Sequence, residues 1–412
     1  MSPTAELLSP FQSGVVRQVG LLRREGSTLY DISRHGQAAR AWEHAAVTAE
    51  AAGRTEDAAD ARFWQGVALH GMGRLREAIA ALGVVGTHPN AKSVSSRIRH
   101  MALSRAALIG VDVPVSLRTI ERTIADVEHV ETHTGTGRTA RLLLIRARLA
   151  QATGRPQAAL NLAREGLARA HAEDAGFAAG AYLKEALRAC LRCGDLVEAD
   201  RLISGWNRVH DNYTLSRSIF IAAFQSMASR LRGHVAEAIE HGTRAVEASR
   251  PAEELSERLL SSEALVRALL CSDRPHNARP VLARLLRLRS SEPGLVRYEV
   301  RLLLGDFHLA MARRYAGLPA LDIETGTSFA AGSASPDLVR ARRHWRRAER
   351  AWHSARRAGI AIDLSLECAE RATQIAARMA AGTDLLTLIG RCTRDGAVAG
   401  VTGDHRQTGV VI

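Results

Sequence analysis

Apolar residues recur along most of the chain at the three- and four-residue steps of an amphipathic helix, and short turns separate the helical runs. A run ends at a small turn residue, usually glycine, and an alanine follows five residues later near the start of the next helix. The clearest copy is Gly66-Val-Ala-Leu-His-Gly-Met-Gly73-Arg-Leu-Arg-Glu-Ala78-Ile79. Three further pairs have the same spacing: Gly154 and Ala159, Gly194 and Ala199, and Gly233 and Ala238. The pattern predicts pairs of antiparallel helices.

The turns are regularly spaced, which indicates an internal repeat. Weaker copies are Gly36 with Ala41 and Asp273 with Ala278, and Gly110 and Ala312 are interpreted as turns of degenerate units. The turn positions 36, 73, 110, 154, 194, 233, 273 and 312 are separated by 37, 37, 44, 40, 39, 40 and 39 residues. Glycine permits the backbone angles that reverse the chain, and alanine lets two helices approach closely. One helix pair cannot bury its apolar face alone, so the repeat predicts one stacked array and not several separate domains.

The composition agrees with an all-helical chain. Of the 412 residues, 46% are hydrophobic in the broad sense but only 4% are aromatic, and much of the sequence is alanine, leucine, arginine and glutamate, which are strong helix formers. The apolar content argues against a disordered chain, and the shortage of β-branched and aromatic residues argues against a β-sandwich. The predicted fold class is therefore all-α.

Over residues 17–312 the sequence resembles the tetratricopeptide repeat (TPR). This family has a small residue at its eighth position, a glycine at its fifteenth and an alanine at its twentieth, and these positions correspond to Gly66, Gly73 and Ala78. The units here are spaced near 40 residues where the family has about 34, and leucine or alanine replaces most of the family's aromatic residues. The longer helices resemble the arrays of bacterial regulators, including actinobacterial transcription factors, but residues 1–16 are too short for a DNA-binding head. The resemblance implies a right-handed superhelical α-solenoid of about eight antiparallel helix hairpins with a C-terminal closing helical segment.

The repeat rhythm breaks in two places, and these define the predicted organisation. Residues 313–336 contain three glycines and two prolines, and an unstructured loop of this length is either functional or disordered. Disorder is the favoured interpretation of this loop, and a binding lid is the alternative. The predicted segments are a flexible N-terminus (1–16), TPR-like helical repeats (17–312), the long loop (313–336), C-terminal basic and capping helices (337–389) and a disordered tail (390–412).

A strongly basic helix is predicted after the long loop. Ala341, Trp345, Ala348 and Trp352 recur at helical steps and form one apolar stripe. Residues 337–359 also hold eight arginines against two acidic residues. The favoured interpretation is a closing helix with both tryptophans in the core and a solvated cationic face. The alternative is a docking face for an acidic partner or nucleic acid, which would use Arg343, Arg346, Arg347 and Arg350.

A second candidate surface is the groove of the array. In a TPR-like array the first helix of each pair lines the concave face, and its exposed positions lie about thirteen, ten, six and three residues before each turn. Arginine forks suit the bidentate capture of carboxylates or phosphates, so we expect this groove to bind an acidic or carboxylate-bearing peptide segment. The competing interpretation is that these cations are solvated or paired with acidic residues of neighbouring helices. The predicted partner-binding residues are Tyr30, Arg97, Arg141, Arg148, Lys184, Arg188, Arg230 and Arg267.

No pattern for catalysis, a cofactor or a metal stands out. The sequence holds neither a phosphate-binding glycine loop nor a G-x-S-x-G elbow. Cys190-Leu-Arg-Cys193 lacks a second ligand pair, and His129 and His133 lie where a helix gives way to a turn. Buried thiols and a solvated helix end are therefore favoured over metal ligands. We predict no catalytic residues, no metal site and no cofactor.

The N-terminus lacks a secretory signal, no apolar run reaches the roughly 18 residues that span a bilayer, and the five cysteines do not resemble a secreted disulfide framework. We therefore expect a cytoplasmic protein without membrane contact.

The first functional hypothesis is a scaffold or regulatory module that binds a protein or peptide. The alternative is a nucleic-acid-associated transcriptional regulator, which the net charge of +13 permits but the shortage of aromatic residues beside the basic positions disfavours. An enzyme or accessory protein of a biosynthetic pathway comes third, because no residue constellation supports it.

Overall fold

The structure is a computed structural model, and it describes residues 10–390 apart from short internal segments. The residues outside the description are 1–9, 33, 87–93, 112, 114–115, 135–139, 173–175, 207–213, 252–253, 288–294, 330–335 and 391–412. The described residues contain 17 α-helices and no strands, which confirms the predicted all-α class. The helices are α1 (Pro10–Asp31), α2 (His35–Ala51), α3 (Thr55–Gly71), α4 (Leu75–Gly86), α5 (Ser96–Gly110), α6 (Leu117–Thr134), α7 (Ala140–Ala152), α8 (Pro156–Ala172), α9 (Gly176–Cys193), α10 (Leu196–Trp206), α11 (Thr214–Leu231), α12 (Val235–Ala248), α13 (Leu255–Leu270), α14 (Arg279–Arg287), α15 (Leu295–Tyr315), α16 (Leu338–Ser365) and α17 (Glu370–Ala380), with a short 3-10 helix, η2 (Pro275–Ala278), before α14.

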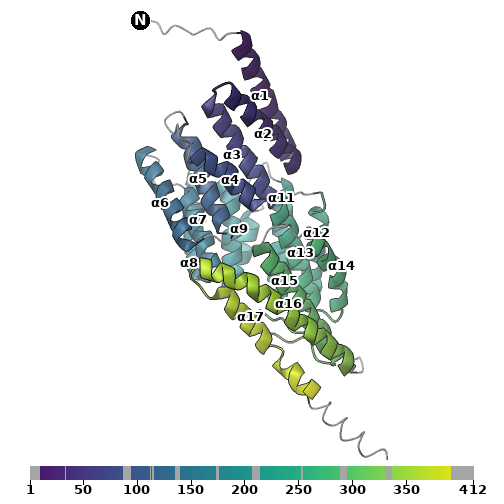
Figure 1. The fold of residues 1–412 in the computed structure, drawn as a ribbon. Coiled ribbons are helices and arrows are strands. Elements are labelled where there is room, and N and C mark those ends of the chain that lie inside the picture. The colour runs from purple at the N-terminus through teal and green to yellow at the C-terminus, as the bar shows by residue number, and fades with distance from the viewer. Residues whose placement is uncertain are drawn as a thin grey trace, which may run out of the picture.

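Helices that follow one another in the chain pack side by side, and the stack forms an elongated molecule (Figure 1). Alternate helices also touch: α3 contacts α5, α5 contacts α7, α7 contacts α9, α9 contacts α11, α11 contacts α13, and α13 contacts α15. The odd-numbered helices from α3 to α15 therefore form one continuous layer, with even-numbered helices packed against it. This is the arrangement expected when each pair buries its apolar face against its neighbours.

Glycine turns join several of these helices, as the sequence predicts. Gly73 has a φ of 77°, in the left-handed region that glycine enters without steric cost, and its N–H donates to the His70 carbonyl at 2.9 Å. Gly110 is the last residue of α5, and Asp273 lies between α13 and η2. The other predicted turn glycines with positive φ are Gly154 (75°), Gly194 (75°) and Gly233 (83°).

The alanines that follow these turns lie where two helices approach closely. In the first copy, Gly66 of α3 faces α4, because a Cβ atom there would lie 2.7 Å from Leu82 Cγ and 3.3 Å from the Ala78 carbonyl oxygen. A larger side chain at either small position would push α3 and α4 apart. Each alanine that follows one of the four glycine turns is 0% exposed: Ala78, Ala159, Ala199 and Ala238. Close alanine packing explains why so few aromatic residues suffice for the core.

The predicted turn at Ala312 is wrong. Ala312 lies inside α15, which continues to Tyr315 because Leu309, Ala312 and Ala316 are buried in the cluster that α15 shares with α16. The chain turns instead at Gly317, where φ is 71°. The predicted start of the long loop at residue 313 therefore falls within the helix.

The N-terminal end also differs from the prediction. Gly36 lies in the first turn of α2, and the helix α1 begins at Pro10, inside the segment predicted to be flexible. Gly53 (φ 69°) joins α2 to α3 and is followed five residues later by the buried Ala58. This turn connects one helix pair to the next, so it falls between the regularly spaced positions. Residues 1–9 and the predicted tail beyond 390 lie outside the described residues.

The closing helix α16 packs against α15 through the predicted stripe. Trp345 is 5% exposed and Trp352 is 0% exposed, which confirms that both tryptophans belong to the core. Trp352 Nε1 donates to Asp306 Oδ1 of α15 at 3.1 Å. Gly305 makes room for this ring, because a Cβ atom there would lie 2.2 Å from Trp352 Nε1.

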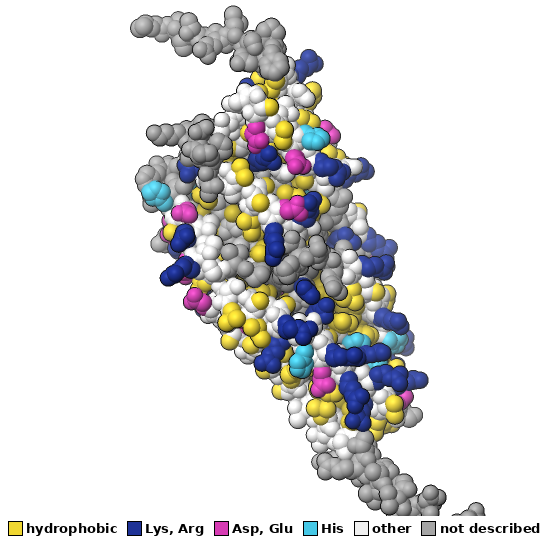
Figure 2. Space-filling model, in the orientation of Figure 1, with side chains coloured by type: hydrophobic (Ala, Val, Ile, Leu, Met, Phe, Trp, Pro, Cys, Tyr) yellow, Lys and Arg dark blue, Asp and Glu magenta, His cyan; other side chains and the backbone are white. Residues whose placement is uncertain are grey.

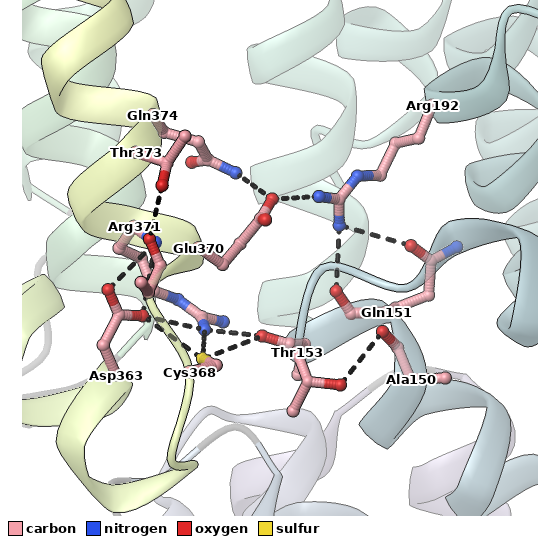
Figure 3. A network of polar contacts seen from close by, with 12 residues as sticks. Ala150, Gln151, Thr153, Arg192, Asp363, Cys368, Glu370, Arg371, Thr373 and Gln374 are labelled. Carbon is pink, nitrogen blue, oxygen red and sulfur yellow. Dashed lines mark hydrogen bonds and ion pairs between the residues drawn. The ribbon is translucent and has the colours of Figure 1, made fainter.

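The C-terminal segment folds back onto the middle of the array (Figure 3). Arg371 of α17 is 5% exposed and donates from Nη1 to the Ala152 carbonyl at the end of α7, at 2.6 Å. Its backbone N–H donates to both carboxylate oxygens of Asp363, at 3.2 and 3.0 Å. Glu370 pairs with Arg192 at the end of α9. These contacts connect positions 178 and 219 residues apart, so they tie the two halves of the array together.

Candidate binding site

The predicted partner-binding cations all lie in the layer of odd-numbered helices. They occupy α5 (Arg97), α7 (Arg141 and Arg148), α9 (Lys184 and Arg188), α11 (Arg230) and α13 (Arg267). The structure divides them into two groups. Those on α5, α7 and α9 form a cluster of positive charge, whereas those on α11 and α13 hold carboxylates of the chain itself.

The first group is joined by two residues of α3 and α5. Arg105 Nη2 lies 3.2 Å from His70 Nδ1, and because arginine always donates, the Nδ1 atom accepts and the imidazole is neutral. Burial, and then the positive charges of Arg105, Arg148 and Lys184, lowers the pKa of His70 well below its ordinary value. These side chains therefore lie close together. We call the following residues the cationic cluster: His70, Arg97, Arg105, Arg141, Arg148, Lys184 and Arg188.

Lys184 is a member whose positive charge is opposed by its surroundings. Burial, followed by the charge of Arg188, lowers the pKa of Lys184 to about 8, although Glu185 and Glu254 act in the opposite direction. The Lys184 Nζ atom lies 4.8 Å from the centre of the Phe220 ring. The ring offers a cation–π contact, which is weaker than an ion pair with a carboxylate.

Arg97 and Arg141 form an exposed edge of the cationic cluster. Although solvent reaches Arg141, the surrounding protein displaces enough water to lower its pKa, and the charges of Arg105 and Arg97 lower it further. Like charges held this close repel one another, and an anion placed among them would relieve the repulsion.

Glu185 is an acidic residue built into the cluster. It is 2% exposed, and its Oε1 atom accepts from Arg188 Nη1 at 3.1 Å. Burial alone would raise the pKa of Glu185, but Arg188, Arg148 and Lys184 outweigh it, and the pKa is lowered. Glu185 therefore fixes Arg188 and neutralises part of the cluster. Among the described residues that act on these groups, positive charge remains in excess.

Arg230 and Arg267 are held by two carboxylates from the predicted long loop. Arg230 is 5% exposed and pairs with Asp322, which is 3% exposed, and Arg230 Nη2 lies 2.6 Å from Glu324 Oε2. Glu324 Oε1 lies 2.8 Å from Arg267 Nη1. Burial opposes the negative charge of Glu324, but Arg267 and then Arg230 lower its pKa to about 2. This matches the competing interpretation of paired cations. The acids come from a distant segment and, for Arg267, also from Glu263 of its own helix and Asp306 of the neighbouring α15.

We call residues 318–329, which supply these carboxylates, the acidic insert. The backbone of the acidic insert forms a tight antiparallel turn, with a bridge between Leu321 and Ser328 and a hydrogen bond from the Asp322 N–H to the Thr327 carbonyl at 2.9 Å. Over these residues the structure differs from the favoured interpretation, which was disorder. The ion pairs across the layer of odd-numbered helices are the physical reason.

Tyr30 lies in a group of aromatic rings formed by α1, α2 and α3. Its ring centre is 4.7 Å from that of His35, 5.8 Å from that of Trp42 and 6.5 Å from that of Trp64. Trp42 is 2% exposed and Tyr30 packs against the core cluster that contains it, whereas Trp64 is 36% exposed at the edge of this group. Packing therefore accounts for Tyr30.

Arg105 is the cluster residue that sequence reasoning missed. Counting six positions back from the turn at Gly110 selects Ser104 instead. Ser104 is 4% exposed and its hydroxyl donates to the His100 carbonyl at 2.6 Å, so this position faces the packing. A shift of one position along α5 would have found Arg105.

The arginine-rich helix α16 presents its charges to solvent. Its apolar stripe is buried, and the arginines on the remaining surface are all exposed. Figure 2 shows a dense group of basic side chains over this part of the molecule, with histidines beside it. The exposed arginines of α16 are Arg340, Arg342, Arg343, Arg346, Arg347, Arg350, Arg356 and Arg357.

Cys190 is buried, and burial raises the pKa of its thiol to about 12, whereas Cys193 is exposed, so the predicted burial is confirmed for Cys190 and wrong for Cys193. His129 is exposed, and the side chain of His133 lies outside the described residues. In the described part of the chain, no three His, Cys, Asp or Glu side chains form a group that could hold a metal ion. The helices described there are all too short or too polar to cross a membrane.

The fold and the site together define an all-helical protein whose helices stack on their neighbours like a helical-repeat array. No protein-family model matches the chain, and no curated protein matches it either. The observations that bear on function are therefore the cationic cluster, the acidic insert and the arginine face of α16.

Proposed function

We propose that this protein is an interaction module, a right-handed TPR-like α-solenoid of about eight helix hairpins that binds an acidic segment of a partner protein. The observation that carries the proposal is the cationic cluster. It brings positive side chains of α5, α7 and α9 together around the neutral His70 of α3, and, besides burial, their charges lower the pKa values of His70, Arg141 and Lys184. An acidic segment would add negative charge beside these cations, of which Glu185 neutralises only part.

The acidic insert supports the same proposal, because it is an acidic segment that binds to the same helix layer. Asp322 and Glu324 are two positions apart and contact arginines of two successive odd-numbered helices, α11 and α13. A short acidic sequence can therefore connect two such helices. The cationic cluster offers similar donors on α5, α7 and α9, and guanidinium groups there can bind carboxylates bidentately.

Binding of an acidic peptide is expected to weaken about tenfold between pH 7 and pH 9.5, which corresponds to about 1.4 kcal/mol. Lys184, with a pKa of about 8, loses its proton in this range, while aspartates of the peptide stay ionised. A bound anion favours the charged lysine, so affinity is highest below the pKa of free Lys184 and falls above it. The measurement is the fluorescence anisotropy of a labelled peptide of alternating aspartate and serine, titrated at each pH.

Two substitutions at the same position provide the controls for this titration. Lys184→Gln is expected to bind about tenfold less tightly at pH 7, with no further loss up to pH 9.5, because its side chain carries no proton to lose. Lys184→Arg keeps its charge and is expected to bind across the whole range. A wild-type profile that runs parallel to that of Lys184→Gln would contradict the proposal.

A further inference from the structure

The exposed side of α16 carries a row of arginines. Arg343, Arg350 and Arg357 recur every seven residues, so they lie nearly in line on the side opposite the buried stripe. Arg346 and Arg347 fill the interval between the first two. At about 1.5 Å per residue, the row from Arg343 to Arg357 is about 21 Å long. We call these five residues the arginine row.

The arginine row has no acidic partner within the described part of the protein. Among the α16 arginines, Arg340 forms an ion pair there, with Asp337 at 3.2 Å. Several arginines elsewhere in the molecule do have acidic partners: Arg23 pairs with Asp57, Arg62 with Glu50, and Arg201 with Glu198. The charge of the row is therefore available to an external partner.

No large apolar side chain is exposed beside the row among the described residues of α16. Those that are exposed, Val339, Ile360 and Leu364, lie beyond its two ends. A protein interface has an apolar centre, and a single-strand site uses aromatic rings for stacking on bases. The arginine row offers neither feature. It offers guanidinium groups in a line, which suits a partner that presents closely spaced phosphates.

We propose that the arginine row binds the phosphate backbone of double-stranded nucleic acid without reading its base sequence. A duplex carries about one negative charge per 1.7 Å of its axis, so several phosphates fall within the length of the row. The helix that carries the row is firmly held, because Trp352 is 0% exposed and hydrogen-bonds to Asp306. The row is separate from the cationic cluster, and this inference does not depend on the proposed peptide binding.

The test compares two triple variants of the full chain that change the net charge equally. R343E/R350E/R357E reverses the arginine row, and R97E/R141E/K184E reverses exposed and partly buried members of the cationic cluster. Binding to a labelled duplex of mixed sequence, about 24 base pairs long, is measured by fluorescence anisotropy from about 50 to about 200 mM salt. Circular dichroism and urea unfolding check that both variants are folded.

For the wild type, the logarithm of the association constant is expected to fall linearly with the logarithm of salt, with a slope of about −4. R343E/R350E/R357E is expected to reduce the magnitude of this slope by about three and the affinity about 1,000-fold, roughly tenfold per lost contact. R97E/R141E/K184E is expected to keep the slope and to stay within about threefold of the wild-type affinity. If reversal unfolds the helix, R343Q/R350Q/R357Q replaces it, with the same expected loss of slope.

The proposal is overturned if the wild type does not bind the duplex, or if both triple variants lose affinity equally. It is also overturned if the wild type binds vesicles of anionic phospholipid but not the duplex. A row variant that loses the duplex but still binds the acidic peptide would support the arginine row as a separate site. Whether R97E/R141E/K184E loses peptide binding bears on the proposed function and not on duplex binding by the arginine row.

Discussion

Arg230→Met is expected to lower the free energy of unfolding by about 3 to 5 kcal/mol, because it leaves a buried carboxylate without its counter-ion. Arg230 and Asp322 are 5% and 3% exposed, and Arg230 also holds Glu324 at 2.6 Å. Methionine fills similar space, so lost packing contributes little to the change. Urea unfolding followed by circular dichroism measures the difference.

The double variant Arg230→Met/Asp322→Asn is the matched control for the buried pair. It removes both charges, and a neutral amide is much less costly to bury than an uncompensated carboxylate, so most of the lost stability should return. Arg40→Met, at an exposed position of α2, should change the free energy of unfolding by less than about 0.5 kcal/mol. A loss below about 1 kcal/mol for Arg230→Met would show that this ion pair does not hold the acidic insert.

Asp306→Ala is expected to destabilise the protein by about 3 to 5 kcal/mol, because Asp306 is the acceptor of a buried polar network. It is 1% exposed and accepts from Trp352 Nε1 at 3.1 Å and from Arg378 Nε at 2.9 Å. Its removal leaves the Arg378 side chain, which is 5% exposed, without this carboxylate, and the indole N–H without its acceptor. The free energy of unfolding in urea again measures the effect.

Asp306→Asn separates the two contributions of the carboxylate. The amide oxygen can still accept from Trp352, whereas the charge that faces Arg378 is lost, so the destabilisation should lie between those of wild type and Asp306→Ala. Equal stability of wild type and Asp306→Ala would mean that α15, α16 and α17 are held by apolar packing alone.

The glycine turns could be predicted from the sequence because their cause is local. Gly73, Gly154, Gly194 and Gly233 adopt positive φ, and five residues later a buried alanine lets the next helix approach. Ala312 did not behave in this way, since nothing local ends the helix before Gly317. Alanine favours helix as well as close packing, so the same residue type is ambiguous at a degenerate turn.

The stripe on α16 was predictable for a similar reason. Helical periodicity places Trp345 and Trp352 on one face, and apolar residues so placed are buried. The same periodicity places the arginines on the other face. Periodicity alone does not show which helix packs against that buried face. It is α15, where Asp306 accepts a hydrogen bond from Trp352 and Gly305 leaves room for its ring.

Whether a predicted groove cation is paired within the chain depends on contacts between positions that are distant in the sequence. Arg230 meets Asp322 and Glu324, which follow it by 92 and 94 residues, and no local pattern connects these positions. Arg97, Arg141 and Lys184 lie on the predicted helices. Besides burial, the stacking of α5, α7 and α9 brings the charges of Arg105 and Arg97 to bear on the pKa of Arg141, and that of Arg148 on the pKa of Lys184. The remaining error is an offset of one residue along α5: counting back from the turn selects Ser104, whereas Arg105 is the residue in the cationic cluster.

The proposed function is tested most directly by measuring the affinity of R97E/R141E/K184E for an acidic peptide by calorimetric titration. R343E/R350E/R357E, which changes the net charge by the same amount, is the control. If the cationic cluster binds acidic segments, the cluster variant loses at least about 100-fold in affinity, while the control stays within about threefold of wild type. Equal affinities for wild type and the cluster variant, or equal losses in both variants, would contradict a binding site on α5, α7 and α9.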